Sequence, residues 1–459
     1  MPYLGTMWTW VISCFVLRFA AGVWVDLEQS GAVANDRGAA VANTHLLNAK
    51  LAELQPNDTL FISNRTFWVA GGVRAINFQS VTIRLDGTLR FLPGRDGWPL
   101  QRTCGINPLQ PIRGKTCVQE AFYIANVSGL ILTSNGTGTL DGSGQAWWGY
   151  INYLRFGEDR PRLLSMINVV DALVERWRFI NSPYWTFTAF DVARLEVRHC
   201  AIDNRVNSDD EHSTANLAAL NTDGFDVSGR DIHIHHSSVW NQDDCFTVQP
   251  TDSTGVNAHC TENVLIEDVN ASGLGLTIGA VRPTRGHNCV RNVTFRRAVM
   301  HHTFKGIYVK SQHSDDPKAT AELTNLLYED VDMDSPSQVP IWIGPAQEAD
   351  SKDACSLVWP ELPFAKCPPP PTTVRWTNIT LRNIRVRSPK QSPGLVYGNP
   401  ESPMEGVVFD HVTVSHPGKH PWGSDFYKCE GVHGRATGNT FPVPPCFRDS
   451  RAASQQLLV

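Results

Sequence analysis

From about residue 172 onward, apolar or small side chains recur in a fixed pattern at positions p, p+2, p+5 and p+7. Each unit of this pattern contains two short period-2 runs with a phase break between them, as when a strand turns a corner and again points a side chain inward. The units begin at Ala172, Leu195, Ile232, Val264, Val293, Leu326, Ile379 and Val407. The pattern therefore predicts a series of similar pairs of short strands.

Successive units begin roughly 23 to 37 residues apart, except for one gap of 53 residues. The gap contains Cys355, Cys367 and the run Pro368 to Pro371, and we interpret it as an insertion. A repeat of this length cannot bury a core alone, so neighbouring repeats must stack on one another. Because short β-branched strands recur without helices between them, we predict an all-β fold, a single-domain parallel β-helix (a solenoid). A β-sandwich is the alternative, but it does not explain a repeated two-strand motif.

A helix is predicted ahead of the repeats, over residues 39 to 54, and Pro56 ends it. The residues that fall roughly on one face of this helix are Val41, His45, Leu46, Ala49 and Leu54. Strands are expected to follow at 59–62, 66–69 and 81–85. We expect the helix to cap the N-terminal end of the solenoid, where it would shield apolar core and open strand edges.

The first residues, Met1 to Gly22, are apolar, with a run from Trp8 to Leu17 followed by small residues. This arrangement is typical of a secretory signal peptide, and the run is too short to span a bilayer comfortably. No later segment is apolar enough for a membrane helix. We therefore expect residues 1–22 to be a signal peptide and residues 23–459 to form the β-helix domain of a secreted, extracellular protein.

Charge excludes one broad class of function. The 459 residues carry a formal net charge of −5, whereas a general nucleic-acid binder needs a basic face to neutralise phosphate. An anionic polysaccharide is not excluded, because a local basic groove can coexist with an acidic whole.

Cysteine usage agrees with secretion, since ten of the 11 cysteines lie after the predicted signal and form an even set. Proximity in the sequence predicts four disulfides, namely Cys104–Cys117, Cys245–Cys260, Cys355–Cys367 and Cys429–Cys446, and leaves Cys200–Cys289 as the remainder. No Cys-x-x-Cys motif is present, so nothing has zinc-ligand spacing. Glycosylation sequons occur at Asn57, Asn64, Asn126, Asn135, Asn270, Asn292 and Asn378.

Three carboxylates flank the unit that begins at Ile232. Asp223 precedes it, and Asp243 and Asp244 follow it about 20 residues later. One coil of a β-helix would bring them near each other, because equivalent residues of adjacent coils stack about 4.8 Å apart. Hydrolysis of a glycosidic bond needs one carboxylic acid for the leaving oxygen and a carboxylate to activate water. Aspartate is also common at turns beside strands, and that structural role is the alternative for each residue alone.

Several motifs in this order resemble the polygalacturonase family of pectin-degrading enzymes, glycoside hydrolase family 28. They are Leu140-Asp141-Gly142-Ser143-Gly144 with Trp147-Trp148, Asn181-Ser182-Pro183-Tyr184-Trp185-Thr186, Asn221-Thr222-Asp223-Gly224-Phe225-Asp226, and Asn241-Gln242-Asp243-Asp244-Cys245. The likeness runs from about residue 26 to 446. It implies a right-handed parallel β-helix that hydrolyses its substrate with inversion and needs no cofactor or metal.

The resemblance also implies a role for each acid. Asp243 would be the general acid, and Asp223 and Asp244 would activate the water, at a separation of about 6.5–9.5 Å between acid and base. Asp226 is expected to be structural. The amides of Asn221, Asn241 and Gln242 are expected to orient the carboxylates, with Asn221 and Gln242 at the substrate-binding surface.

The sequence departs from the family pattern at two positions. Leu274 replaces the family's usual histidine, and Tyr308 replaces the arginine of its R-I-K motif, while Lys310 is kept. The rhamnogalacturonan-cleaving branch of the family also lacks the histidine and keeps the lysine. We expect Lys310 to bind a substrate carboxylate and Tyr308 to stack on a sugar face. Arg282 is expected to contribute a second cation, and the other basic residues that could line the same groove are Arg285, His287, His301, His302 and Lys305.

The leading hypothesis is thus a secreted, monomeric, inverting hydrolase of pectic polysaccharide, with polygalacturonate as substrate and rhamnogalacturonan or a related pectic exo-cleavage as the alternative. Neither nucleic acid nor a membrane is an expected partner. Two other classes stay open at this point. A pectate lyase would use calcium and an arginine base, and a catalytically inactive β-helix would only bind carbohydrate or a partner.

Overall fold

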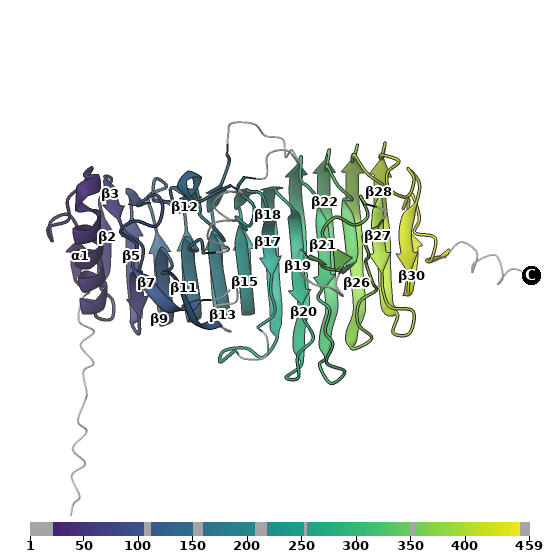
Figure 1. Cartoon of the computed structure of the whole chain (residues 1–459), viewed down its shortest axis with the longest axis horizontal. Helices are drawn as coiled ribbons and strands as arrows, with labels where there is room; N and C mark the ends of the chain where they lie inside the picture. Colours follow the sequence, from purple (N-terminus) through teal and green to yellow (C-terminus); the bar gives the residue numbers. More distant parts are fainter. Residues whose placement is uncertain are drawn as a thin grey trace, which may run out of the picture.

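The computed structural model describes residues 22–104, 112–149, 159–206, 218–251, 255–348, 355–362 and 364–449. The predicted signal therefore lies outside the described residues, except for Gly22. Strands from successive coils stack side by side along one long axis, with the α-helix α1 at the N-terminal end (Figure 1). Pairing between coils is parallel in the 27-stranded main sheet. The parallel β-helix and its terminal helix are confirmed, and a β-sandwich is excluded.

Each coil contributes two or three short strands. The N-terminal part contains β1 (Trp24–Asp26), η1 (Arg37–Ala39), α1 (Ala40–Glu53), β2 (Thr59–Ile62), β3 (Thr66–Val69), β4 (Val73–Ile76), β5 (Gln79–Leu85), β6 (Thr88–Phe91), β7 (Leu100–Cys104), β8 (Ile112–Val118), β9 (Phe122–Thr133), β10 (Thr139–Asp141), η2 (Gly144–Ala146), β11 (Leu164–Glu175), β12 (Arg178–Ile180), β13 (Phe187–Arg198) and β14 (Ala201–Asp203). The remainder contains β15 (Phe225–His235), β16 (Ser238–Trp240), β17 (Asp244–Val248), β18 (Thr261–Ser272), β19 (Gly275–Val281), β20 (Asn288–His301), β21 (Ile307–Ser311), β22 (Ala321–Asp334), β23 (Ile341–Pro345), β24 (Gln347–Glu348), β25 (Cys355–Ser356), β26 (Val374–Arg387), β27 (Gly394–Tyr397), β28 (Met404–Ser415), β29 (Tyr427–Glu430), β30 (Val432–Thr437) and β31 (Arg448–Asp449).

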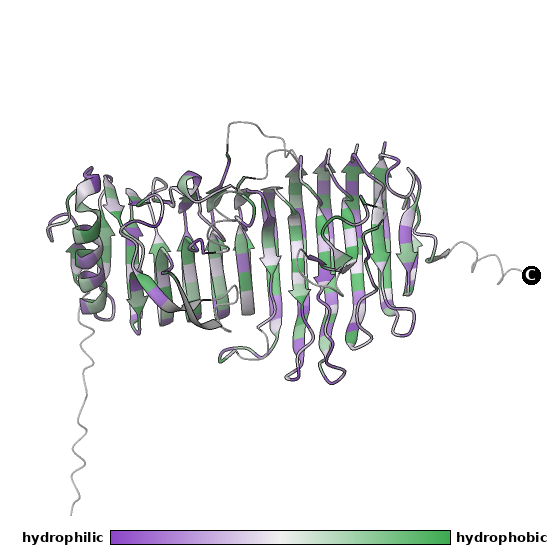
Figure 2. Ribbon diagram, in the orientation of Figure 1, coloured by the Kyte–Doolittle hydropathy of each residue, from purple (hydrophilic) through white to green (hydrophobic). Residues whose placement is uncertain are grey.

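The repeat pattern corresponds to the core of the solenoid. The first apolar position of each unit pairs in register with the same position of the next unit, from Ala172 opposite Leu195 to Ile379 opposite Val407. The last position does the same, from Phe179 opposite Ile202 to Val386 opposite Val414. Figure 2 shows the resulting alternation of hydrophobic and hydrophilic bands along the strands. All eight predicted units are confirmed.

The phase break in each unit is a corner made by one residue in the left-handed backbone conformation. At position p+4 these residues are Arg176, His199, His236, Asp268, Arg297, Asp330, Asn383 and His411, all with positive φ. A second corner precedes each unit at p−1, at Asp171, Arg194, Asp231, Asn263, Asn292, Asn325, Asn378 and Gly406. Asparagine, aspartate and glycine tolerate this region best. Each corner changes the direction of the chain, so the apolar side chains of both period-2 runs point into the core.

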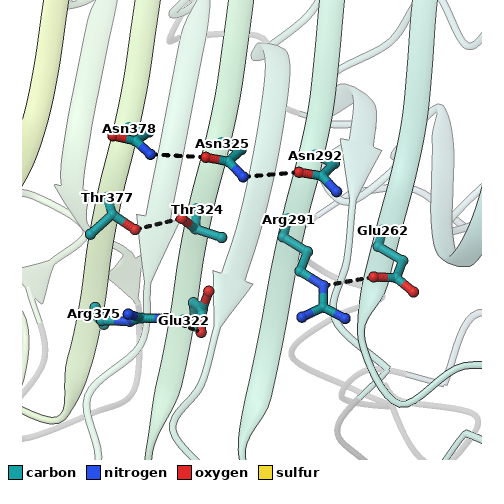
Figure 3. Close-up of a pocket in the computed structure, with 9 residues that line it drawn as sticks. All are labelled: Glu262, Arg291, Asn292, Glu322, Thr324, Asn325, Arg375, Thr377 and Asn378. Atoms are coloured by element: carbon teal, nitrogen blue, oxygen red, sulfur yellow. Dashed lines mark hydrogen bonds and ion pairs between the residues drawn. The ribbon is translucent and has the colours of Figure 1, made fainter.

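One corner carries a ladder of side chains on the surface, shown in Figure 3. Asn378 donates to Asn325, and Asn325 donates to Asn292, each over 3.0 Å. Below them Arg291 pairs with Glu262, and Arg375 with Glu322. We call this surface the ladder face, formed by Glu262, Arg291, Asn292, Glu322, Thr324, Asn325, Arg375, Thr377 and Asn378.

The terminal helix caps the solenoid, but with a different face from the predicted one. Its buried residues are Ala40, Asn43, Thr44, Leu47 and Leu51, whereas Val41 is exposed. The reason is polar: Asn43 donates to the Trp68 carbonyl, Thr44 accepts from the Ala70 N–H, and Asn48 accepts from the Arg74 N–H. These side chains bond the free backbone edge of the first coil, so hydrophobicity alone gave the wrong face.

The disulfide pattern corrects two predictions. Cys355–Cys367 and Cys429–Cys446 are present as predicted, and Cys117 is disulfide-bonded, while the Cys104 side chain lies outside the described residues. Cys260 pairs with Cys289 instead of Cys245, because adjacent coils place the two residues opposite each other. Cys245 and Cys200 are buried free thiols.

The predicted insertion lies between β23 and β26 and is closed by the Cys355–Cys367 disulfide. It is anchored on the solenoid at its start, where the Gln347 N–H donates to the Tyr308 hydroxyl over 3.1 Å. Within the described ranges, no helix has the length and apolarity needed to cross a membrane.

Candidate active site

Two turns on adjacent coils bring the three predicted acids together. Asp223 precedes β15, and Asp243 and Asp244 stand at the start of β17. The turns are joined where the Gly224 N–H donates to the Asp244 carbonyl over 2.8 Å. One carboxylate oxygen from each aspartate lies within 4.8 Å of the others. The three acids, which flank one repeat unit in the sequence, therefore meet in space as predicted.

Buried amides hold these turns through the backbone. The Asn241 side chain donates to the Thr222 carbonyl and, over 2.7 Å, to the Asp244 carbonyl. The Gln242 side chain accepts from the Ala219 N–H over 2.8 Å. Both amides thus bond main-chain groups that the tight turns leave unpaired, and in this way they hold the turns that carry the acids.

Asp243 is the most accessible of the three acids, since it is partly exposed whereas Asp223 and Asp244 are 4% and 3% exposed. Its Oδ1 accepts from the Asp244 N–H over 2.9 Å, and its Oδ2 accepts from the Asn221 N–H over 3.3 Å. Asn221 thus contacts the acid with its backbone, and its own side chain is exposed.

Asp244 is held from both sides by the following coils. Thr277 donates to its Oδ1 over 2.6 Å, and Lys310 Nζ donates to its Oδ2 over 2.8 Å. These two contacts occupy both oxygens of the Asp244 side chain. Asp223 differs, because its buried Oδ1 has no hydrogen-bond partner.

A fourth carboxyl group, that of Asp226, lies on β15, three residues after Asp223. It is fully buried, its Oδ1 accepts from Gln249 over 3.4 Å, and its Oδ2 has no partner. Asp226 stands in register with Thr247, which in turn stands opposite Thr277. A row of buried polar side chains therefore connects Asp226 to the threonine that bonds Asp244.

Burial and mutual repulsion raise the proton affinity of the cluster. Burial first, then Asp244, raises the pKa of Asp243 to about 6 against a pull from Lys310 in the other direction. Burial and Asp244 raise the pKa of Asp226 to about 8. Burial, followed by repulsion from Asp243 and Asp226, holds the pKa of Asp223 well above its usual range. The cluster therefore keeps protons at mildly acidic pH, as acid catalysis requires.

Tyr308 lies beneath Lys310. Its ring is 3% exposed, and Lys310 Nζ lies 4.3 Å from the ring centroid. Little of the ring is open to a ligand, which does not fit the predicted stacking of Tyr308 on a sugar face. Cation–π attraction from Tyr308 and the ion pair to Asp244 together fix the position of the ammonium group.

Lys305 is a second cation near the site. It is 4% exposed, donates to Gln338 Oε1 over 2.8 Å, and lies 4.9 Å from the Tyr308 ring centroid. Burial and repulsion from Lys310 lower its pKa to about 7, against attraction from Asp244 and Asp243. Lys305 is thus the one basic residue of the group named from the sequence that the structure places beside Lys310 and the acids.

The other basic candidates are engaged elsewhere or point to solvent. Arg285 pairs with Asp316, and His287 contacts Thr320. Arg282 is exposed just beyond β19, and His301 is exposed at the end of β20. Leu274, in place of the family's histidine, adjoins the acids through its N–H, which donates to the Asp243 carbonyl over 2.7 Å.

Two contacts in the site had no signal in the sequence. Thr277 carries the hydrogen bond to Asp244 but sits in an apolar strand where a threonine is ordinary. Arg160 donates to the Leu220 carbonyl over 2.7 Å, beside the Asn221 turn, and lies over the Tyr184 ring. Both depend on contacts between residues far apart in the sequence.

The three acids are also the one group among the described side chains with the spacing of a metal site. Carboxylates alone suit a hard cation such as calcium. Here, however, both oxygens of Asp244 already accept hydrogen bonds, and Lys310 supplies a positive charge that opposes a second cation. The donor set fits proton transfer better than metal binding.

Comparison with known proteins agrees with this geometry. The family "Glycosyl hydrolases family 28" matches residues 78–438. A probable endopolygalacturonase D of Emericella nidulans is 28% identical over 213 residues, 45% of this chain and 38% of that protein. An exopolygalacturonase of Platanus acerifolia is 23% identical over 344 residues, 74% of this chain and 80% of that protein.

A solved structure shows the same fold. The polygalacturonase from Erwinia carotovora superposes with a TM-score of 0.62 at 16% identity, over 91% of this chain and 97% of that one. At this identity the likeness shows the fold alone. The family match, by contrast, spans β5 to the end of β30 and includes the four carboxyl groups of the site, those of Asp223, Asp226, Asp243 and Asp244. The chain therefore belongs to glycoside hydrolase family 28.

Proposed function

We propose that the protein is a secreted, inverting glycoside hydrolase that cleaves pectic polysaccharide. The observation that carries the proposal is the cluster of Asp223, Asp243 and Asp244, with one partly exposed acid whose pKa is about 6 beside a carboxylate held by Lys310. Glycoside hydrolysis needs this combination of a proton donor and an ionised base.

In this mechanism Asp243 gives its proton to the glycosidic oxygen as the bond from that oxygen to the anomeric carbon breaks. A water molecule attacks the same carbon from the other side, and its proton passes to Asp244 or Asp223. Thr277 and Lys310 hold the Asp244 carboxylate in place before the reaction. Asp223 Oδ1 is free to accept from the water, and that hydrogen bond would stabilise its ionised form.

Lys310 also supports an acidic substrate. Its side chain remains 14% exposed beside Asp244, so its ammonium group can reach a sugar carboxylate. A galacturonate next to the cleaved bond would provide that carboxylate, and Arg282 would add a more distant positive charge. Secretion is supported by the disulfides, which form and persist in oxidising compartments.

The close approach of the acids favours one alternative, hydrolysis with retention. Retaining enzymes place their two carboxyl groups about 5–5.5 Å apart, nearer to the observed contact than the spacing typical of inverting enzymes. Retention needs Asp223 or Asp244 as a nucleophile. We favour inversion because Lys310 and Thr277 already bond both oxygens of Asp244, and Asp223 is buried.

The test is digestion of a panel of pectic polymers by the wild type and by Asp243→Asn. We expect new reducing ends, no ultraviolet-absorbing unsaturated product, and a first-formed product of inverted anomeric configuration by proton NMR. Unsaturated products that disappear with a chelator would identify a lyase. A retained anomer would establish the nucleophilic route, and no cleavage of any polymer would leave a binding protein.

A further inference from the structure

Three histidines gather on the surface at the far end of β15 from the catalytic acids. The strand ends at His235, and the corner residue His236 follows it, whereas Asp223 lies just before the strand begins. On the preceding coil His199 occupies the same corner, and its N–H donates to the His235 carbonyl over 3.3 Å. The strands that carry these residues, β13 and β15, are paired neighbours (Figure 1). The proposed hydrolysis makes no use of these histidines.

Two ring nitrogens of this group face each other. His235 Nδ1 lies 2.7 Å from His236 Nδ1, and we call these two residues the histidine pair. Each nitrogen of a neutral imidazole either donates a proton or accepts one with its lone pair. One proton must therefore lie between the two nitrogens when no other cation binds them. A metal ion that accepts both lone pairs would displace that proton.

The second ring nitrogen of His235 is held by a carboxylate on the neighbouring strand. His235 Nε2 lies 3.3 Å from Glu196 Oε1. A carboxylate only accepts hydrogen bonds, so Nε2 carries the proton and the Nδ1 of the neutral ring presents its lone pair. Histidines that bind a metal almost always donate their other N–H to a partner of this kind. Glu196 thus sets His235 in the form that a metal ion needs.

The spacing of the histidine pair favours one coordination geometry. Imidazole nitrogens bind divalent transition metals at about 2.0–2.1 Å. At that bond length, neighbouring ligand atoms lie about 2.9 Å apart in a square-planar site and about 3.3 Å apart in a tetrahedral one. The observed 2.7 Å is nearer to the first value. Square-planar nitrogen ligation is typical of Cu²⁺ and Ni²⁺, whereas Zn²⁺ prefers a tetrahedron.

The remaining coordination positions face solvent and the preceding coil. His236 and His199 are exposed, and the centroids of their rings lie 5.1 Å apart. The pair itself offers two close ligand atoms. Water, or a nitrogen of His199 after rotation of its ring, would supply the others. A metal ion can therefore reach the pair directly from solvent.

The charged side chains around the pair are already matched. Arg198 donates to Glu175 and to Glu196. Arg297 donates to Asp268, the corner residue that follows His236 on the next coil. Because a carboxylate offsets each arginine, the surroundings do not repel a metal ion.

His233 lies on the same strand but outside the pair. Its ring stacks on that of His235 with 4.3 Å between centroids, and its Nε2 lies 2.9 Å from Glu267 Oε1. Its close contact is thus with a carboxylate and not with a second histidine nitrogen. His233 is therefore a matched control for the pair.

We propose that His235 and His236 form a binding site for a divalent transition-metal ion that prefers square-planar nitrogen ligands, Cu²⁺ above all. Both Nδ1 atoms coordinate the ion in neighbouring positions, and the proton between them is released. When His199 provides a third nitrogen, the ion joins β13 to β15 at their corners. The site goes beyond the proposed hydrolysis and does not depend on it.

The test titrates the full chain, freed of metal by a chelator and then dialysed, with Cu²⁺. Calorimetry measures the affinity, and electron paramagnetic resonance identifies the ligand atoms. We expect one equivalent of Cu²⁺ to give a tetragonal spectrum with hyperfine lines from imidazole nitrogen. His235→Gln and His236→Gln should each weaken binding at least about 10-fold, since even the loss of a ligand's hydrogen-bond partner costs about 10- to 100-fold.

Two further variants separate ligation from general effects of the surface. His233→Gln should leave the Cu²⁺ affinity unchanged. Glu196→Ala should weaken binding but keep the nitrogen lines, because it removes the partner of a ligand and not a ligand. Bound Cu²⁺ should raise the melting temperature of the wild type and not that of His236→Gln. Without metal, all four variants should hydrolyse pectic polymers at the wild-type rate.

A wild-type spectrum without nitrogen lines would overturn the proposal, because it would place the ion on oxygen ligands such as those of the acids. Equal losses of affinity in His233→Gln and in the two pair variants would also overturn it. The His236 side chain is exposed, so its replacement keeps the fold and its result decides the question. Failure to cleave any polymer would refute the hydrolase and leave the metal site untouched.

Discussion

The ladder face and the active site are built from the same kinds of side chain on the same scaffold, yet they behave in opposite ways. On the ladder face each acid meets a base one coil away, as Glu262 meets Arg291 and Glu322 meets Arg375 (Figure 3). In the active site, by contrast, four carboxyl groups lie together, and Lys310 donates a hydrogen bond to one of them, Asp244. Solvent screens the first set, and burial concentrates the repulsion in the second.

The pKa values express the same contrast. Glu267, a buried acid on β18, is opposed by burial but receives hydrogen bonds from Arg296, His233 and Arg297, which together lower its pKa to about 2. Asp243 and Asp226 are raised to about 6 and about 8. A carboxyl group that meets a cation on the next coil thus has a lowered pKa and forms an ion pair. A buried carboxyl group that meets other carboxyl groups has a raised pKa and can donate a proton.

Replacement of the general acid is expected to have the largest effect. Asp243→Asn removes the proton donor, and kcat should fall about 10²- to 10⁴-fold, because this is the usual contribution of general acid catalysis. Initial rates of reducing-end release on a cleaved pectic polymer provide the measurement. Glu262→Gln on the ladder face is the control, and its kcat should stay at the wild-type value. Near-normal turnover by Asp243→Asn would remove Asp243 from the mechanism.

Loss of the cation that bonds Asp244 should reduce stability far more than loss of a cation on the ladder face. Lys310→Met leaves Asp244 buried without its partner, and we expect a loss of about 3–5 kcal/mol in the free energy of unfolding at neutral pH. The exposed counterpart, Arg291→Met, should cost about 0–1 kcal/mol. Denaturant unfolding followed by circular dichroism compares the two variants. Similar losses in both would show that burial does not distinguish the two regions.

Lys310→Met should also shift the pH dependence of any remaining activity. The reaction needs protonated Asp243, so the wild-type rate should fall as pH rises through about 6. Lys310 lowers the pKa of Asp243, and its removal should move this decline to higher pH. A pH–rate profile measures the shift, and a decline at lower pH in the variant would contradict the assigned acid.

Two buried acids, Asp226 in the active site and the arginine-paired Glu267, should respond to pH with opposite signs in stability. Asp226 has a pKa raised above its unfolded value of about 3.9, so its contribution is complete below that pH and is lost as pH rises through about 8. Glu267 has a lowered pKa, so its contribution is present above about 4.3 and is lost as pH falls toward about 2. Asp226→Asn should therefore raise the melting temperature most at alkaline pH, and Glu267→Gln should lower it most near neutrality. The same sign in both would refute the contrast.

The smallest expected effect concerns the two buried thiols. Cys200 and Cys245 are enclosed in the core, and burial raises the pKa of the Cys200 thiol to about 12 and that of Cys245 as well. Both should resist alkylation in the native protein and react after unfolding without reductant. Peptide mapping reads this directly, and a Cys245–Cys260 peptide would contradict the pairing of Cys260 with Cys289.

The sequence by itself determined the features that depend on local pattern. Period-2 runs specified the inward positions of eight units, and even the phase breaks coincide with left-handed corners such as Asp268 and Asn383. The pattern also placed Cys200 at a core position, where proximity rules wrongly sought a disulfide. The acids Asp223, Asp243 and Asp244 were evident because they flank one unit, and a coil returns the chain to nearly the same place.

Only the tertiary structure decided what depends on register between coils. Loops between strands differ in length, so spacing in the sequence does not show which residues become neighbours. Lys310 reaches Asp244 across 66 residues, Cys260 meets Cys289 across 29, and Tyr308 is covered by an insertion that the repeat marked only as a gap. The helix face was likewise set by backbone groups of the first coil, which no pattern within the helix reveals. The local hydrophobic pattern determines which residues point into the core of the solenoid. The stacking of coils determines which charged and polar side chains become neighbours in the active site.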